Sequence, residues 1–115
     1  MTIAEFEHQV FLVTIASPIC GIPVIRRLMP TSINLRVPMT VGGFVDVFYN
    51  EETGMTAYAL VQEGHRVFGA DNTGGWHIHP FDDPVYHQAL PGEMSFAEFV
   101  AEVERHYQSR SENET

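Results

Sequence analysis

The chain has little of what would anchor a protein in a membrane, cross-link it or mark it for export. No apolar run approaches the roughly 20 residues that a membrane-spanning helix needs. The first residues, MTIAE, carry an acid where a secretory signal carries basic residues. A single cysteine, Cys20, excludes an internal disulfide. Together these absences predict a soluble, cytoplasmic protein with a free thiol.

Lysine is absent, and six arginines against 15 acidic residues give a formal net charge of -9. Because affinity for a phosphate backbone usually depends on basic patches that release counterions, this composition disfavours tight, unaided binding to nucleic acid. Any contact with RNA must therefore be local. The acidic surface suits a basic partner protein. The lack of lysine is compatible with either a biased genome composition or adaptation to salt.

What the chain does contain is typical of one compact domain. It has 115 residues, of which 44% are hydrophobic and 18% are charged, and a second hydrophobic core would have too few residues. We expect residues 1–108 to form a single α+β domain. The polar segment 109–115 is expected to be a disordered tail.

Two capping boxes predict one helix near each end of the domain. Thr2 and Glu5 form the first, apolar residues then recur at steps of three and four, and Pro18 forbids continuation, which predicts a helix over 3–16. The β-branched residues in 10–15 make a strand the competing interpretation there. Ser95 and Glu98 form the second box, which predicts a helix over 96–108.

Between the two helices, turn residues separate short extended segments that are typical of an antiparallel meander. Both faces of the segment 44–49 are largely apolar, so we expect it to be a central strand. The predicted fold is an antiparallel sheet of four to six strands with an N-terminal and a C-terminal helix. The predicted strands are 23–27, 33–37, 44–49, 56–62 and 66–70, followed by one that carries His77 and His79.

The segment 69–88, GADNTGGWHIHPFDDPVYHQ, gathers three histidines and three aspartates. In an extended chain His77 and His79 project from one face, and Trp76 and Ile78 from the other. Two imidazoles on one side can bind one metal ion or act together on one substrate. Pairs of histidines at this spacing also occur on exposed strands without any function.

The same residues support two kinds of chemistry. Zinc or a similar divalent ion needs about three protein ligands in a catalytic site, and His77 and His79 with either His87 or Asp83 satisfy that count. Metal-free acid–base cleavage of an RNA phosphodiester needs a base, an acid and a cation. His77 and His79 suit the first two roles and Arg66 the third.

Other polar residues of the chain have less specific interpretations. Tyr49 and Tyr86 are candidate auxiliary donors for the acid–base site. The Asp71–Asn72 pair is interpreted as a turn former rather than as a functional pair. Trp76 is expected to anchor the core, and the remaining histidines are expected at the surface: His8, His65 and His106.

The order of these features resembles the TumE-type proteins of bacterial and archaeal toxin–antitoxin loci. The resemblance covers most of the chain, although the arginine lies closer to the Asp-Asn pair in that family and Gly-Gly-Trp is not part of its pattern. It implies a toxin-like protein that acts on RNA and is held inactive by a basic, DNA-binding antitoxin. The matching residues are Arg66, Asp71, Asn72, His77, His79, Pro80 and His87.

A second resemblance concerns the His-x-His-Pro core of the JAMM metalloproteases, in which two histidines bind zinc. That family continues with Ser-x-x-Asp, whereas the corresponding region here, 85–90, contains neither serine nor aspartate. Asp82 or Asp83 would have to be the third ligand, at a spacing that differs from that of the family. The cupin pattern fits less well, because the chain has one His-x-His motif and no second half of the metal site.

Three functions follow as expectations. The first is a toxin–antitoxin-type protein with metal-independent ribonuclease activity through His77, His79, His87 and Arg66, and no cofactor. The second is a metal-dependent hydrolase that uses His77, His79 and Asp83 or His87. The third is a non-catalytic module whose histidine face contacts a partner protein. The sequence leaves open whether the chain forms a homo-oligomer.

Overall fold

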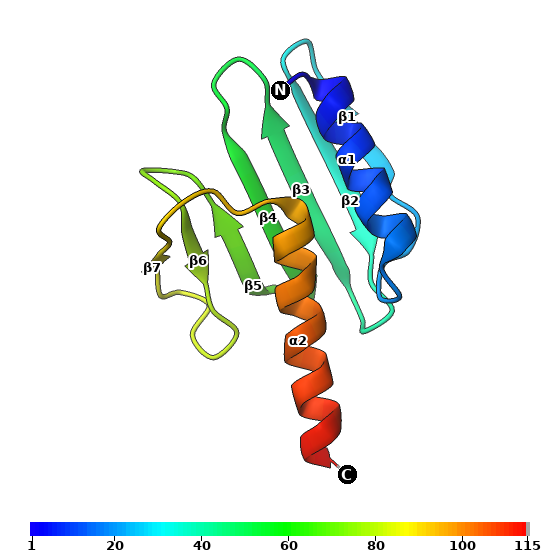
Figure 1. Cartoon of the computed structure of the whole chain (residues 1–115). Coiled ribbons are helices and arrows are strands. Elements are labelled where there is room, and N and C mark those ends of the chain that lie inside the picture. The colour runs from blue at the N-terminus through cyan, green and yellow to red at the C-terminus, as the bar shows by residue number, and fades with distance from the viewer. Residues whose placement is uncertain (115) are drawn as a thin grey trace.

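The computed structural model describes residues 1–114, with side chains up to residue 110, as one antiparallel sheet with a helix at each end of the chain (Figure 1). Helix α1 is Ile3–Ala16 and helix α2 is Phe96–Glu114. The seven strands pair in chain order. They are β1 (Val24–Leu28), β2 (Ser32–Pro38), β3 (Phe44–Asn50), β4 (Thr56–Gln62), β5 (His65–Asp71), β6 (His77–His79) and β7 (Gln88–Ala89).

The α+β class is confirmed, with one strand more than the predicted four to six. The additional strand is β7, which has only two residues. Strands so short carry no alternating pattern, so the sequence gives no signal for them. Strand β7 forms because β6 offers a free edge, and Gln88 and Ala89 pair with Ile78 and His77.

Both capping boxes form as the sequence predicts. The amide of Glu5 donates to the Thr2 hydroxyl at 3.1 Å, and the amide of Thr2 donates to the Glu5 carboxylate at 3.1 Å. Ser95 and Glu98 repeat this exchange at 2.9 and 3.1 Å. The helix over 3–16 is confirmed, so the competing strand interpretation is wrong.

The predicted end of the second helix is wrong. Helix α2 continues to Glu114, so residues 109–114, expected as a disordered tail, are helical. No glycine or proline follows residue 108, and a run of polar residues indicates solvent exposure rather than a helix end. Thr115 lies outside the described residues. Neither helix among the described residues is long and apolar enough to cross a membrane.

Both helices lie on one side of the sheet, which we call the covered face (Figure 1). Alternate residues of β2 to β5 are buried beneath them, and β3 shows this pattern with Val45, Val47 and Tyr49. The opposite side, which we call the open face, has no described helix over it and carries half-buried residues such as Phe44 and Phe48. The predicted central position of β3 is confirmed, because it lies between β2 and β4.

Candidate functional site

The register of β5 against β6 brings the candidate residues together on the open face. Asp71 pairs with His77, and Gly69 pairs with His79. Phe68 and Ala70 are buried on the covered face, so the alternating residues between and after them point to the open face. The prediction that His77 and His79 share one face is confirmed, since their ring centroids are 5.0 Å apart.

The third histidine joins them from the neighbouring strand. Pairing of β6 with β7 places His87, just before β7, beside His79. The His87 ring lies 4.3 Å from the His79 ring and is stacked 4.8 Å from the His77 ring, measured between centroids. The three residues differ in access: His79 is 3% exposed, His77 is half-buried and His87 is exposed. A substrate can therefore reach His77 and His87 more readily than His79.

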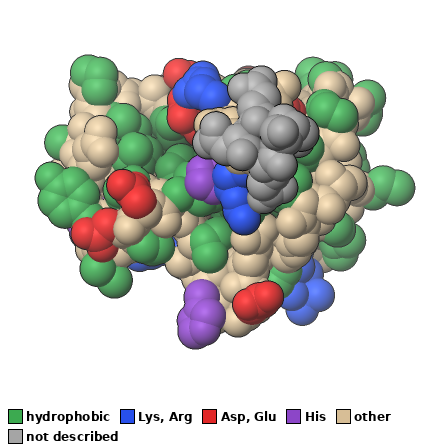
Figure 2. Space-filling view, turned by 90° about the horizontal axis from the view of Figure 1, so that it is seen from below, with side chains coloured by type: hydrophobic (Ala, Val, Ile, Leu, Met, Phe, Trp, Pro, Cys, Tyr) green, Lys and Arg blue, Asp and Glu red, His purple; other side chains and the backbone are tan. Residues whose placement is uncertain are grey.

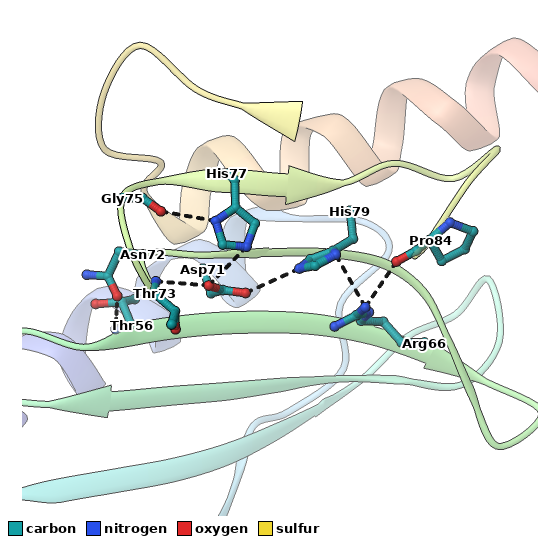
Figure 3. Close-up of polar contacts among 9 residues, drawn as sticks. All are labelled: Thr56, Arg66, Asp71, Asn72, Thr73, Gly75, His77, His79 and Pro84. Carbon is teal, nitrogen blue, oxygen red and sulfur yellow. Dashed lines mark hydrogen bonds and ion pairs between the residues drawn. The ribbon is translucent and has the colours of Figure 1, made fainter. Parts of the chain in front are cut away.

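Asp71 connects two of these rings (Figure 3). Its two carboxylate oxygens lie 3.3 Å from Nε2 of His77 and 3.3 Å from Nε2 of His79. Burial opposes ionisation of this carboxyl, but the amide of Thr73 at 3.0 Å and the two histidines outweigh it, so its pKa is lowered. Asp71 is thus an ionised group at the centre of the site.

The interpretation of Asp71 as a turn former missed this role. Asp71 is the last residue of β5, and its carboxylate accepts from the amide of Thr73 in the following turn, as the turn interpretation predicts, but it also contacts both histidines. The alternation of side chains along an extended chain could have indicated its orientation, because Asp71 lies two residues after Gly69 and therefore points to the same face. In the structure it lies opposite His77, the first residue of β6. Its neighbour Asn72 does hold the chain locally, by accepting a hydrogen bond from the amide of Thr56 at 2.9 Å.

Arg66 reaches the site as the sequence predicts. Its Nη2 lies 3.3 Å from Nδ1 of His79 and donates to the carbonyl of Pro84 at 3.0 Å (Figure 3). The ladder between β4 and β5 shifts register between Phe68 and Arg66, so Val67 is an extra residue and Arg66 pairs with Val61. Strict alternation would place Arg66 and Gly69, three residues apart, on opposite faces. Because of the bulge they lie on the same face.

Gly69 leaves room for both neighbouring side chains. A Cβ at this position would lie 3.0 Å from Cδ of Arg66 and 3.6 Å from Cδ2 of His79. The backbone there is not in the left-handed region, so the glycine is required for space rather than for its conformation.

The contacts of His79 fix its tautomer. The guanidinium of Arg66 only donates, so Nδ1 of His79 accepts and Nε2 carries the hydrogen that faces Asp71. Burial lowers the pKa of His79, the Arg66 charge adds to this effect, and Asp71 opposes it. His79 is therefore a neutral imidazole with both ring nitrogens engaged.

His77 has acceptors at both of its ring nitrogens. Nδ1 lies 3.0 Å from the carbonyl oxygen of Gly75, to which it must donate, and Nε2 faces the Asp71 carboxylate. When Nδ1 of a neutral imidazole carries the hydrogen, the lone pair of Nε2 faces the negatively charged carboxylate, and the two repel each other. A proton or a metal ion bound at Nε2 would remove this repulsion. A histidine whose Nδ1 donates to a backbone carbonyl is also the usual arrangement of a metal ligand.

Three residues could hold a divalent metal ion. One ring nitrogen each from His77, His79 and His87 lies within 4.8 Å of the others. The alternative ligand Asp83 is not a member of this group and is exposed on the loop after β6. His79 would have to release Arg66 and change tautomer before its Nε2 could bind an ion.

A shallow groove borders the accessible histidines. It has a volume of about 420 Å³ and is lined by His77 and His87 together with the glycine turn that precedes β6. In that turn Gly74 and Gly75 have φ values of 69° and 108°, which favour glycine. The groove gives the histidines a neighbouring surface on which a substrate can lie.

Some predicted residues lie elsewhere. The ring of Tyr49 is buried on the covered face and its hydroxyl donates to the carbonyl of Met1 at 2.6 Å, so it is not part of this site. Tyr86 is exposed on the loop after β6. His8 and His65 are exposed as predicted, whereas His106 is half-buried and stacked 3.6 Å from the Phe81 ring.

Comparison with known proteins yields no relative: no family model matches the chain, and neither a curated protein nor a solved structure is significantly similar to it. The TumE-type and JAMM resemblances therefore stay expectations. A function has to be argued from the open-face cluster, which we define as Arg66, Asp71, His77, His79 and His87.

Proposed function

We propose that this chain is a toxin–antitoxin-type small protein whose open-face cluster cleaves RNA without a metal ion. The observation that carries the proposal is the chain of contacts from Arg66 through His79 to Asp71. It engages both nitrogens of the buried histidine, which disfavours metal binding. It also leaves an arginine and two further histidines within reach of a substrate.

The proposed reaction is attack of an RNA 2′-oxygen on the adjacent phosphorus. His87, the exposed histidine, accepts the proton of the 2′-hydroxyl. His77, held between the Gly75 carbonyl and Asp71, releases Asp71 to donate a proton from Nε2 to the departing 5′-oxygen. The P–O5′ bond breaks as the new P–O2′ bond forms, so the products are a 2′,3′-cyclic phosphate and a 5′-hydroxyl.

The remaining residues of the cluster stabilise charge or position the rings. Arg66 is exposed and offers its guanidinium to the phosphoryl oxygens as negative charge develops on them. Asp71 and His79 act through their neighbours: the carboxylate orients His77, and the buried imidazole holds Arg66. They are therefore positioning residues.

Charge limits how RNA can bind. The chain carries a net charge of -9, and in the view along the C-terminal end of α2 the basic side chains form separate patches among acidic and apolar ones (Figure 2). With so acidic a net charge, RNA contact has to be short and centred on Arg66. The same acidic character suits a basic antitoxin as the inhibitory partner.

The test is cleavage of a short single-stranded RNA by purified protein in the presence of a chelator. We expect a product with a 2′,3′-cyclic phosphate, and rates lower by about 10²- to 10⁴-fold for His87→Ala, His77→Ala and Arg66→Ala. His65→Ala is the matched control, because His65 is an exposed imidazole on the same strand as Arg66. Expression of the chain alone should arrest growth, and the His77→Ala/His79→Ala variant should relieve the arrest. Loss of all cleavage on chelation, or harmless expression of the intact chain, would contradict the proposal.

The second candidate is a metal-dependent hydrolase, and the observation that favours it is the convergence of three imidazole nitrogens within 4.8 Å. Zinc sites with three protein ligands and one open position activate water. Elemental analysis separates the two candidates, since this one requires about one metal ion per chain. Under this candidate Arg66→Ala should raise metal affinity by freeing Nδ1 of His79 from its donor.

A further inference from the structure

A second cavity lies on the covered face, on the other side of the sheet from the open-face cluster. It has a volume of about 300 Å³ and lies between α1, the strands β3 and β4, and the segment that leads into α2. It is formed by residues far apart in the chain, including Phe6, Tyr58 and Phe96. A volume of this size is at the lower end of the range for small-molecule sites.

Five of the thirteen residues that line this cavity are aromatic. Phe6 and Tyr49 are stacked at 4.5 Å, and Tyr58 lies 6.2 Å from Trp76 and 5.6 Å from Phe96, measured between ring centroids. The hydroxyl of Tyr49 donates to the carbonyl of Met1, and that of Tyr58 donates to the carbonyl of Met94. Because both hydroxyls are engaged, the tyrosines offer mainly their rings to an occupant.

Among the described residues that line the cavity, one side chain is charged, that of Glu93, and Met1 with its N-terminal amino group lines it as well. Glu93 is exposed and lines it. Burial raises the pKa of Tyr58, and the charge of Glu93 raises it further. Burial likewise raises the pKa of Tyr49, with added contributions from Glu51, Glu5 and Glu93. No arginine is among the described residues that line the cavity.

We infer that this cavity binds a small organic cation, of the size and chemistry of a quaternary ammonium group. The faces of aromatic rings attract a cation through their quadrupole, and a carboxylate at the rim adds a full negative charge. The Glu93 carboxylate disfavours phosphate and carboxylate ligands. The volume accommodates a molecule of about choline's size.

The cavity lies on the other face of the sheet from the open-face cluster, although Trp76 lines both this cavity and the groove beside the histidines. Trp76 lines the cavity from the covered face, and the next residue, His77, points to the open face. Two neighbouring residues on β5 and the following turn also point to opposite faces: Asn72 lines the cavity, and Asp71 contacts His77 on the open face. An occupant would therefore contact the turn that carries the histidines without contacting the histidines themselves.

The chain's single tryptophan provides the readout. Choline should change the fluorescence of Trp76 saturably, with a dissociation constant of about 1 mM or lower. The neutral probe 3,3-dimethylbutan-1-ol has nearly the same shape without the charge and should bind at least about tenfold more weakly. Nuclear Overhauser effects from the choline methyl protons to both the Trp76 indole and the Phe6 ring would place the probe in the cavity, because Phe6 lines the cavity and not the groove beside the histidines.

Two charge-matched variants sharpen the test. Glu93→Gln should weaken choline binding by about tenfold, because it removes the carboxylate at the rim and leaves the exposed backbone unchanged. Glu63→Gln, on the turn between β4 and β5, changes the net charge equally and should leave binding unchanged. Since both positions are exposed, neither variant threatens folding. Equal affinity for the neutral probe, an equal effect of the two variants, or no saturable response to choline would each overturn the inference.

Discussion

The two faces of the sheet are built from the same strands for different purposes. On the covered face, β5 contributes Phe68 and Ala70 to a core of apolar and aromatic side chains. On the open face the same strand contributes Gly69, which leaves room for the side chains of Arg66 and His79, and Asp71, whose carboxylate contacts His77 and His79. Alternation along one strand thus separates the residues that stabilise the fold from those available for chemistry.

The open face is nevertheless partly dry. His79 is only 3% exposed although no described helix covers it. Arg66 and His87 lie against its ring, and Asp71 closes the remaining side. The open-face cluster is therefore a small polar core, in which every buried polar atom of the described side chains has a partner. A buried polar group that loses its partner is costly, so this cluster should respond strongly to the loss of a central member.

The largest expected effect separates the two faces directly. Phe99→Ala should lower the free energy of unfolding by about 3–5 kcal/mol, because Phe99 is fully buried and packs against Tyr58 and Phe68. His87→Ala, an exposed position on the open face, should change it by less than about 0.5 kcal/mol while lowering the rate of RNA cleavage by about 10²- to 10⁴-fold. Urea denaturation of both variants provides the measurement. Similar losses of stability would show that the division between faces does not hold.

The next effect tests how much the open face contributes to stability through Asp71. Asp71→Asn should cost about 1–3 kcal/mol, since one ionised carboxylate serves both His77 and His79. Asp46→Asn is the matched control on the same face. Asp46 forms only a partly exposed ion pair with Arg36 at 3.4 Å, so its loss should cost well under about 1 kcal/mol. An equal loss of stability at both positions would show that the contacts of Asp71 stabilise the fold no more than an ordinary surface ion pair does.

The third prediction concerns the loss of stability at acidic pH that protonation of His79 causes. The folded-state pKa of His79 is depressed below its ordinary value of 6.5, mainly by burial, so the unfolded chain binds the proton first. The stability that neutral His79 contributes is fully present above pH 6.5 and is lost as the pH falls through the folded-state pKa of His79. His79→Gln should flatten this part of the stability profile. The residual slope should come from His106, whose pKa is lowered by burial and by Arg110.

Asp71 should act in a separate, more acidic window. Its folded pKa is lowered below its ordinary value of 3.8, so its contribution is complete above that pH and is lost only as pH falls through the folded value. Denaturation across both windows distinguishes the two groups. A profile for His79→Gln identical to that of the unaltered chain would remove His79 as the cause of the near-neutral slope.

The smallest effect tests the space beside Arg66. Gly69→Ala adds a Cβ about as close to Cδ of Arg66, at 3.0 Å, as to the backbone oxygen of Tyr58, at 3.2 Å. We expect a change of stability within about 1 kcal/mol, because the arginine can move. Once it moves, the pKa of His79 should rise, since the Arg66 charge helps to lower it. An NMR titration of the His79 ring measures this, and an unchanged pKa would show that the guanidinium stays in place.

Much of the fold could be predicted because its signals are local. The two capping boxes determine where both helices begin, and Pro18 determines where the first ends. The end of α2 carries no such residue and was predicted too early. Strand β7 was missed because two residues cannot show a period, and it depends on the edge that β6 provides.

The sequence alone determined that His77 and His79 share one side of a strand, because alternation is a property of an extended chain. Only the tertiary structure decided which side that is, that Asp71 rather than Asp83 lies beside both rings, and that a bulge at Val67 places Arg66 with them. Those outcomes depend on register between strands. A shift of one residue reverses every side chain, and register is fixed by the packing of the whole sheet rather than by any single segment.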